Sequence, residues 1–163
     1  MPLTSTVPGA VAALQTHMGN AVAANPSLAA EVHLGFPTAE VANNYLQIGD
    51  ETGALLVNYR QEFLDFPITA GIGHRTEEYG LLCSMRVWRG DTDPLGRLTD
   101  AFTLLNAVMA ELATDPGGSG ALTPSGTWHV GEVTVPWTGL LKNMGWGVEL
   151  GFTVEIINVR LSA

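Results

Sequence analysis

Residues 77–94 read EEYGLLCSMRVWRGDTDP and place the clearest strand pattern of the chain directly before a helix start. Within 77–89 apolar residues recur at every second position, which predicts a strand with one fully buried face. That face is Tyr79, Leu81, Cys83, Met85 and Val87. The run 91–94, DTDP, offers an acidic cap and a proline at the first helical position, so a helix is expected to follow.

Two amphipathic helices are expected, one before this strand and one after it. The first spans 6–24, with Thr6 able to cap it, and its apolar stripe is rich in alanine, so it should lie close against a sheet. The second ends at Asp115-Pro116. Its expected core-facing stripe is Leu95, Leu98, Phe102, Leu105, Met109 and Leu112.

Short strands are expected on the N-terminal side of the central one. In 31–36 the apolar residues Val32, Leu34 and Phe36 fall on one face. Two further apolar runs between 45 and 60 are separated by a strong turn signal, Asp50-Glu51-Thr52-Gly53.

Two more strands are expected on the C-terminal side. In 127–137, Gly131 and Pro136 indicate an edge strand or a bulge. In 146–161 the alternation slips by one residue near Ile157, which predicts a bulge or a twist.

The resulting order, α-β-(β)-β-α-β-β, has no regular βαβ alternation. It favours a single α+β domain over residues 1–163, with a mainly antiparallel sheet and two amphipathic helices packed on it. Long Gly/Pro-rich loops are expected at 67–76 and 116–126.

The composition favours assembly. Of the 163 residues, 46% are apolar and only 14% are charged; roughly 25% charged residues is usual for a soluble domain. A surface with so few charges is cheap to bury against another subunit, so a homo-oligomer is expected.

The net charge excludes several classes of function. Sixteen acidic residues against seven Lys and Arg give a formal charge of −9, which disfavours binding to nucleic acid or to anionic membranes. No segment resembles a signal peptide or a membrane span of about 20 residues. The single cysteine excludes an internal disulfide. We therefore expect a soluble protein made in a reducing cytoplasm.

Cys83 and the tripeptide Arg89-Gly90-Asp91 suggest function but have structural explanations. Cys83 falls on the buried strand face, where a thiol packs rather than reacts. In the tripeptide, Gly90 permits a strand-to-helix turn and Asp91 favours the helix N-terminus.

His74, Glu77 and Glu78 are the best candidate for a catalytic cluster, and a small enzyme using them is one hypothesis. A solvated strand entry is the favoured alternative, because no perturbing pocket is visible in the sequence. The four histidines lack partners at i+3 or i+4, so no metal is expected. The Gly-Ile-Gly at 71–73 lacks the rest of a dinucleotide fingerprint, so no cofactor is expected either.

Spaced motifs accompany these elements. They are GFP at 35–37, YLQIG at 45–49, RTEEY at 75–79, a turn with paired aspartates before a helix carrying Arg97, and GWGVELGFTV at 145–154. With these motifs the chain resembles, over nearly its whole length, the tail-terminator (minor tail) proteins of long-tailed bacteriophages.

The resemblance implies a structural virion protein at the head-proximal end of the tail, without enzymatic activity. Such a small α+β subunit would assemble as a hexameric ring that caps the tail tube, stops its polymerisation and docks to the head–tail connector protein. DNA would pass through the central hole without sequence-specific binding. The acidic composition fits a lumen that repels DNA.

The residues themselves suggest an interface with neighbouring subunits or partners. The candidates are Ile72, His74, Arg75, Arg86, Trp88, Arg89 and Trp137. The arginines either pair with carboxylates of a neighbour or form intrachain surface pairs worth little. Four tryptophans exceed the needs of the core, so some are expected at this interface.

Two further functions stay open at the level of sequence. One is another head–tail connector or tail-completion component. The other is a monomeric or dimeric binding module that holds its ligand between helix and sheet.

Overall fold

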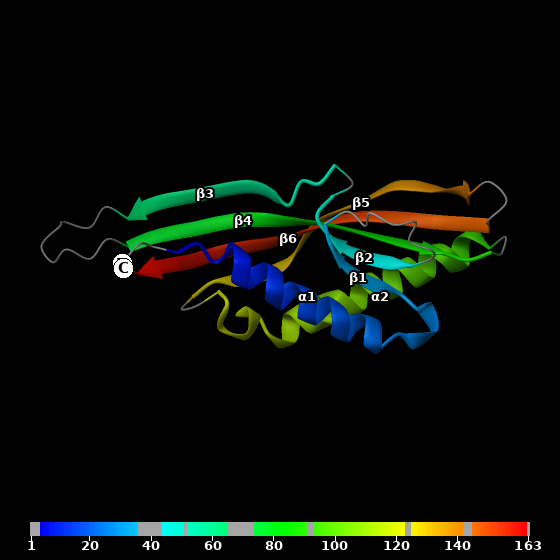
Figure 1. The fold of residues 1–163 in the computed structure, drawn as a ribbon, viewed down its shortest axis with the longest axis horizontal. Coiled ribbons are helices and arrows are strands. Elements are labelled where there is room, and N and C mark those ends of the chain that lie inside the picture. Colours follow the sequence, from blue (N-terminus) through cyan, green and yellow to red (C-terminus); the bar gives the residue numbers. More distant parts are fainter. Residues whose placement is uncertain are drawn as a thin grey trace, which may run out of the picture.

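The computed structural model describes residues 4–35, 44–50, 52–64, 74–90, 93–122, 125–141 and 145–162. These residues form two α-helices and a six-stranded, mostly antiparallel sheet, which confirms the expected α+β class (Figure 1). In chain order the elements are α1 (Val7–Ala23), η1 (Pro26–Leu28), β1 (Glu31–Leu34), β2 (Tyr45–Ile48), β3 (Leu56–Leu64), β4 (His74–Trp88), α2 (Pro94–Thr114), η2 (Gly118–Gly120), β5 (Thr127–Leu141) and β6 (Gly145–Ser162), where η marks a short 3-10 helix.

Strand β4 lies at the centre of the sheet. It pairs with β6 along almost its whole length, and on its other side it pairs first with β3 and then with β2. Strand β1 is parallel to β2 at one edge, and β5 is antiparallel to β6 at the other, in the order β1-β2-β4-β6-β5. The turn expected at 50–53 therefore joins two strands that follow each other along the same side of β4.

The predicted strand at 77–89 is confirmed, and its alternating apolar face is buried in the core. The strand begins three residues earlier than predicted, so His74 and Arg75 are not part of a loop. Each pairs with β3 on one side and β6 on the other. Residues 74–76 are polar and show no alternation of apolar and polar side chains, so no strand signal is present there in the sequence. The strand forms because hydrogen bonds to β3 and β6 hold these residues on both sides.

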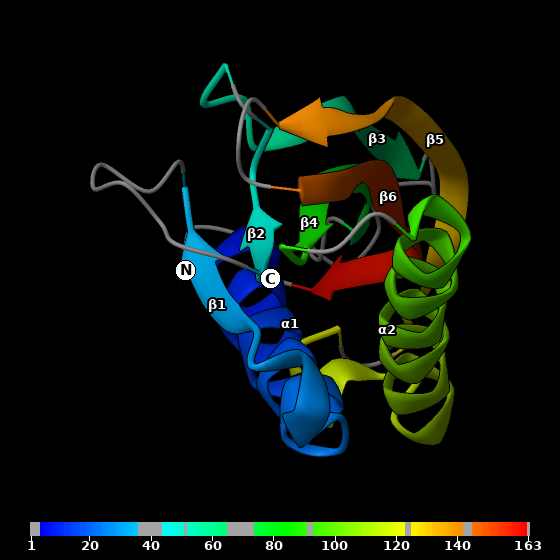
Figure 2. The same cartoon turned by 90° about the vertical axis from the view of Figure 1, so that its right-hand side faces the viewer.

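Both helices pack on the same face of the sheet and contact each other (Figure 2). The buried side of α1 combines Leu14 and Met18 with alanines, which lets the helix lie close, as expected. Thr6 does not cap α1 with its side chain. Asp93 does cap α2, because its carboxylate accepts a hydrogen bond from the Gly96 amide at 2.9 Å.

The side of α2 that is buried against the sheet differs from the predicted one. Its buried residues are Arg97, Ala101, Leu104, Leu105, Val108 and Leu112. Leu95, Phe102 and Met109, which were expected in the core, are exposed. Apolar residues cover more than one side of this helix, and periodicity alone does not indicate which side meets the sheet.

The phase slip in the last strand is a β-bulge, as predicted. Tyr79 of β4 is opposite Ile156, but Glu77 is opposite Val159, so β6 has an extra residue. Asn158 adopts a left-handed backbone there, with φ of 60°. The bulge restores Val159 and Leu161 to the buried face.

The outer strands also match the expected irregularities in part. Strand β5 is an edge strand whose register shifts near Gly131 and again near Pro136, as predicted. Leu34 at the end of β1 is exposed rather than buried, and Phe36 lies outside the described residues. The expected loop at 116–126 contains η2 in its described part.

Candidate functional site

Glu77, which was expected at a solvated strand entry, is fully buried. Its Oε1 accepts hydrogen bonds from the Ser5 hydroxyl at 2.6 Å, the Tyr59 hydroxyl at 2.8 Å and the Gln61 amide at 3.3 Å. Its Oε2 accepts bonds from the Thr6 amide at 2.8 Å and the Thr6 hydroxyl at 2.6 Å. Donors from the segment before α1 and from β3 therefore saturate both oxygens, and the carboxylate lies at the positive end of α1.

The electrostatics of this cluster keep Glu77 ionised. Burial alone would raise the pKa of Glu77, but the hydrogen bonds from Ser5 and Thr6 outweigh it and hold the pKa below its usual value. Burial raises the pKa of the neighbouring Tyr79 to about 12. Because the Thr6 hydroxyl proton goes to Glu77, the Tyr79 hydroxyl donates its own to Thr6 at 2.9 Å.

The proposed trio of His74, Glu77 and Glu78 is not brought together around one site. Glu77 and Glu78 are successive residues of an extended strand, so their side chains leave opposite faces of the sheet. The side chain of His74 lies outside the described part of the structure. The Glu77 side chain is fully buried and both of its oxygens accept hydrogen bonds, an arrangement that ties β3 and the segment before α1 to β4.

Cys83 packs in the core, and burial raises the pKa of its thiol well above the usual value. The expectation of a packing residue is confirmed. Within the described residues, no group of three or more His, Cys, Asp or Glu side chains is placed to hold a metal ion. None of the described helices is long and apolar enough to cross a membrane.

A second polar cluster, which the sequence did not predict, surrounds His17. The imidazole is buried between the carboxylates of Glu111, at 3.5 Å, and Asp115, at 3.2 Å. Its ring is perpendicular to that of Trp128, with centroids 5.4 Å apart. The indole N–H of Trp128 donates to the Asp115 carbonyl at 2.8 Å.

This cluster joins α1 to the C-terminal end of α2 and to β5. A hydrogen bond from Ser119 is the main cause that lowers the pKa of Asp115, and His17 adds to it. His17 is about 95 residues from its partners, so no local spacing in the sequence could indicate the contact. All of its polar atoms contact other parts of the chain, which indicates a structural role.

The predicted interface residues separate into two groups at opposite ends of β4. At the first end, Arg75 donates to the Gln61 side chain at 2.8 Å; His74 begins the strand, and Ile72 lies outside the described residues. Arg75 and Arg86 are on the order of 35 Å apart along the strand, so the two groups cannot form one small contact.

At the second end, Arg86 is bound within its own chain. Its guanidinium lies 2.9 Å from Glu149 and 5.4 Å from the centre of the Tyr45 ring. This is the intrachain pairing that the sequence left as one alternative.

Two nearby residues, Trp88 at the end of β4 and Arg89 just after it, differ in exposure. Trp88 is half-buried and its backbone amide donates to Asn44 at 2.6 Å, whereas Arg89 is exposed. Trp137 lies in register with Glu149, but its side chain lies outside the described residues.

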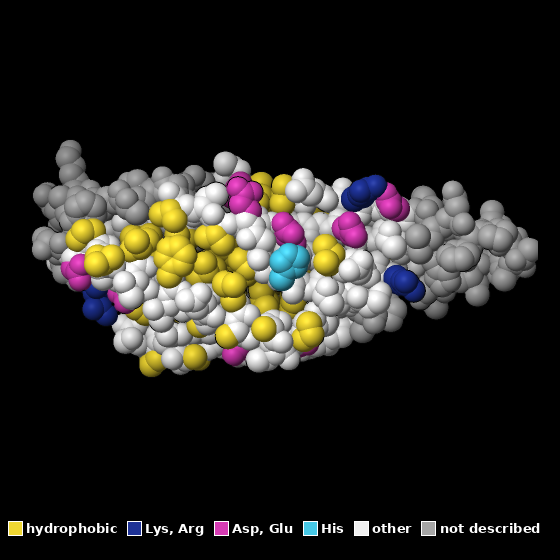
Figure 3. Space-filling model, turned by 180° about the vertical axis from the view of Figure 1, so that it is seen from behind, with side chains coloured by type: hydrophobic (Ala, Val, Ile, Leu, Met, Phe, Trp, Pro, Cys, Tyr) yellow, Lys and Arg dark blue, Asp and Glu magenta, His cyan; other side chains and the backbone are white. Residues whose placement is uncertain are grey.

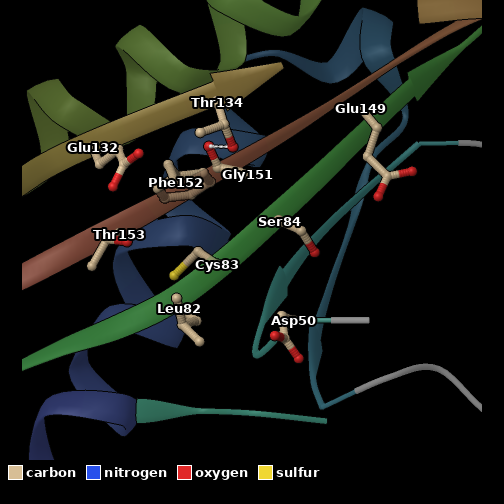
Figure 4. Close-up of a pocket in the computed structure, with 10 residues that line it drawn as sticks. All are labelled: Asp50, Leu82, Cys83, Ser84, Glu132, Thr134, Glu149, Gly151, Phe152 and Thr153. Atoms are coloured by element: carbon tan, nitrogen blue, oxygen red, sulfur yellow. Dashed lines mark hydrogen bonds between the residues drawn. The ribbon is translucent and has the colours of Figure 1, made fainter. Parts of the chain in front are cut away.

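The sheet face opposite the helices carries a shallow groove of about 260 Å³ (Figure 4). Three carboxylates surround it, from Asp50 after β2, Glu132 on β5 and Glu149 on β6. Its lining also includes the small residues Ser84, Gly151 and Thr153. The described lining includes no cation, but Arg86 lies 2.9 Å from Glu149 at its margin, so the negative charge at this groove comes mainly from Asp50 and Glu132.

An apolar strip on α2 and β5 is the largest departure from the prediction. We define the apolar strip as Leu95, Phe102, Met109, Val133 and Val135, whose exposed fractions range from 37% to 71%. The three helical residues are seven apart and so lie in a line along α2. Val133 is opposite the buried Phe152, which places it on the helix side of the sheet. Figure 3 shows hydrophobic side chains gathered on this side of the molecule.

Comparison of the sequence with models of known protein families and with curated proteins finds no match.

Proposed function

We propose that this chain is the subunit of a tail-terminator ring: a structural protein that closes the end of a bacteriophage tail tube and joins it to the head. The observation that carries the proposal is the apolar strip. An exposed line of large apolar side chains on a chain with only 14% charged residues is typical of a subunit that is buried in an assembly.

The polar clusters support a structural rather than a catalytic role. The buried Glu77 and His17 each hold elements together, and their polar atoms are occupied within the chain. The α+β fold is also the one that the resemblance to tail terminators implies.

The charge distribution supports passage of DNA without binding. With a net charge of −9 and carboxylates around the groove on the open sheet face, a ring of these subunits would repel the phosphate backbone. The partners in this proposal are other copies of the chain, the tail tube protein and the head–tail connector protein.

Electron microscopy of particles made with and without the protein tests the proposal. Without it, tubes should be overlong and unattached to heads. Tails of normal length joined to heads in its absence would contradict the proposal. A shortage of joined particles with tubes of normal length would instead favour another head–tail connector component.

A further inference from the structure

We infer that copies of this chain join head to tail, with the apolar strip of one subunit seated in an apolar groove of the next. The inference rests on the proposed ring and identifies its interface. The apolar groove has a volume of about 490 Å³. Its lining includes Val7, Pro8, Val11, Leu34, Ile48 and Leu55.

The strip and the groove lie on opposite sides of the molecule. The groove is formed by the start of α1 and the ends of β1 and β2, and β1 is one edge of the sheet. The strip lies on α2 and on β5, which is the other edge. Figure 2 shows α1, β1 and β2 on one side of the molecule and α2 with the first part of β5 on the other.

The size of the strip fits one side of a specific interface. Five side chains with these exposed fractions present on the order of 400 Å² of apolar surface. A standard contact buries about 800 Å² per partner, a little over half of it apolar. The strip therefore supplies most of the apolar area that such a contact requires.

The chemistry of both surfaces fits a second copy of the chain. Copies that each carry −9 repel one another, so their contact must avoid burying carboxylates. The strip has no charged side chain, and neither does the described lining of the groove. At the rim of the groove Leu34 is 55% exposed, which offers a large apolar side chain to an incoming strip.

Two different surfaces at opposite edges favour a head-to-tail contact. A two-fold dimer uses the same patch on both partners and would leave one of these surfaces uncovered. A head-to-tail contact covers both surfaces in every subunit and closes into a ring when the rotation between neighbours allows it.

The test uses one variant for each surface. The strip variant is Leu95→Lys with Met109→Lys, and the groove variant is Leu34→Lys; all three side chains are exposed, so the fold should persist. The matched controls are Thr103→Lys on α2 and Ser27→Lys in η1, both neutral residues at exposed positions outside the two surfaces. Every substitution makes the chain less acidic, so lost assembly cannot result from added repulsion.

Solution mass by analytical ultracentrifugation, with circular dichroism as the check on folding, gives the readout. Wild type and both controls should form a multimer, and each surface variant alone should stay at the 17.2 kDa of one chain. An equimolar mixture of the two variants should form a dimer and nothing larger, because each pair retains one working contact.

Three results would overturn the inference. They are a wild type that stays monomeric at high concentration, a groove variant that assembles like wild type, and a mixture that stays monomeric. Failure of the proposed function is distinguishable: normal tails in the absence of the protein, together with the expected masses, would leave the head-to-tail contact standing.

Discussion

Glu77 joins three parts of the chain that are distant in sequence. Its carboxylate accepts hydrogen bonds from the segment before α1 and from β3, while its backbone belongs to β4. A buried carboxylate is stable only when donors replace its hydration, and here five do so. The residue therefore fixes where α1 begins relative to the sheet.

Replacing Glu77→Gln tests this role. The glutamine keeps the shape but places N–H groups against the donors of Ser5 and Thr6, so we expect a loss of about 2–3 kcal/mol in the free energy of unfolding. Glu78→Gln, on the opposite face of the same strand, is the matched control and should change it by less than about 0.5 kcal/mol. Chemical denaturation measures both; equal effects would contradict the anchoring role.

The same residue predicts a dependence of stability on pH. Because the folded pKa of Glu77 is lowered, its contribution is complete above the unfolded value of about 4.3 and is lost as pH falls through the folded pKa. The pKa of Asp115 is also lowered in the folded state, so its contribution to stability is likewise lost as pH falls. Denaturation between pH 3 and 7 should show that the free energy of unfolding of wild type falls toward acid pH. In Glu77→Gln this fall should be smaller. An unchanged slope in that variant would contradict this assignment.

At the scale of elements, the two neighbours of β4 carry bulges at the same level, beside Glu78 and Tyr79. One is at Asn158 in β6, and the other is at Asn58 in β3, where φ is 54°. Asparagine tolerates this left-handed backbone better than other non-glycine residues. The bulge in β6 returns Val159 to the core after the slip in the sequence pattern.

Substitution at Asn158 tests whether the left-handed backbone of the bulge is required for the stability of the fold. Asn158→Gly should be nearly neutral, whereas Asn158→Val should cost about 1–2 kcal/mol because a β-branched residue resists positive φ. Arg160→Val, exposed on the same strand without positive φ, is the control and should be tolerated. Thermal unfolding compares the variants with wild type. An Asn158→Val variant as stable as wild type would show that the bulge does not require a left-handed residue.

The elements were predictable because alternation and helix caps are local signals. The strand at 77–89, the cap at Asp93 and the slip near Ile157 all depend on neighbours within a few residues. The burial of Glu77 and His17 was not predictable, since Ser5 and Thr6 are about 70 residues from Glu77 and the carboxylates that contact His17 are about 95 residues away. The exposed side of α2 was missed because the helix is apolar on two sides, and only the sheet decides which is covered.

At the scale of the whole molecule, charge and apolar surface act against each other in assembly. Each copy carries −9, and the strip and groove offer contact without charge. The Debye length falls from about 10 Å at 0.1 M salt to about 3 Å at 1 M. Higher salt should therefore strengthen association, which light scattering across this range measures. A multimer that dissociates as salt rises would instead indicate that ion pairs of Arg75, Arg86 or Arg89 hold it.

Growth of tail tubes from purified tail tube protein tests the central claim most directly. Tube lengths would be measured by electron microscopy after this protein is added at increasing ratios to the tube subunit. We predict that mean tube length falls as the ratio rises, with each stopped tube carrying a ring at one end, and that the groove variant Leu34→Lys is less effective. Tubes that grow to the same length at every ratio would contradict the account.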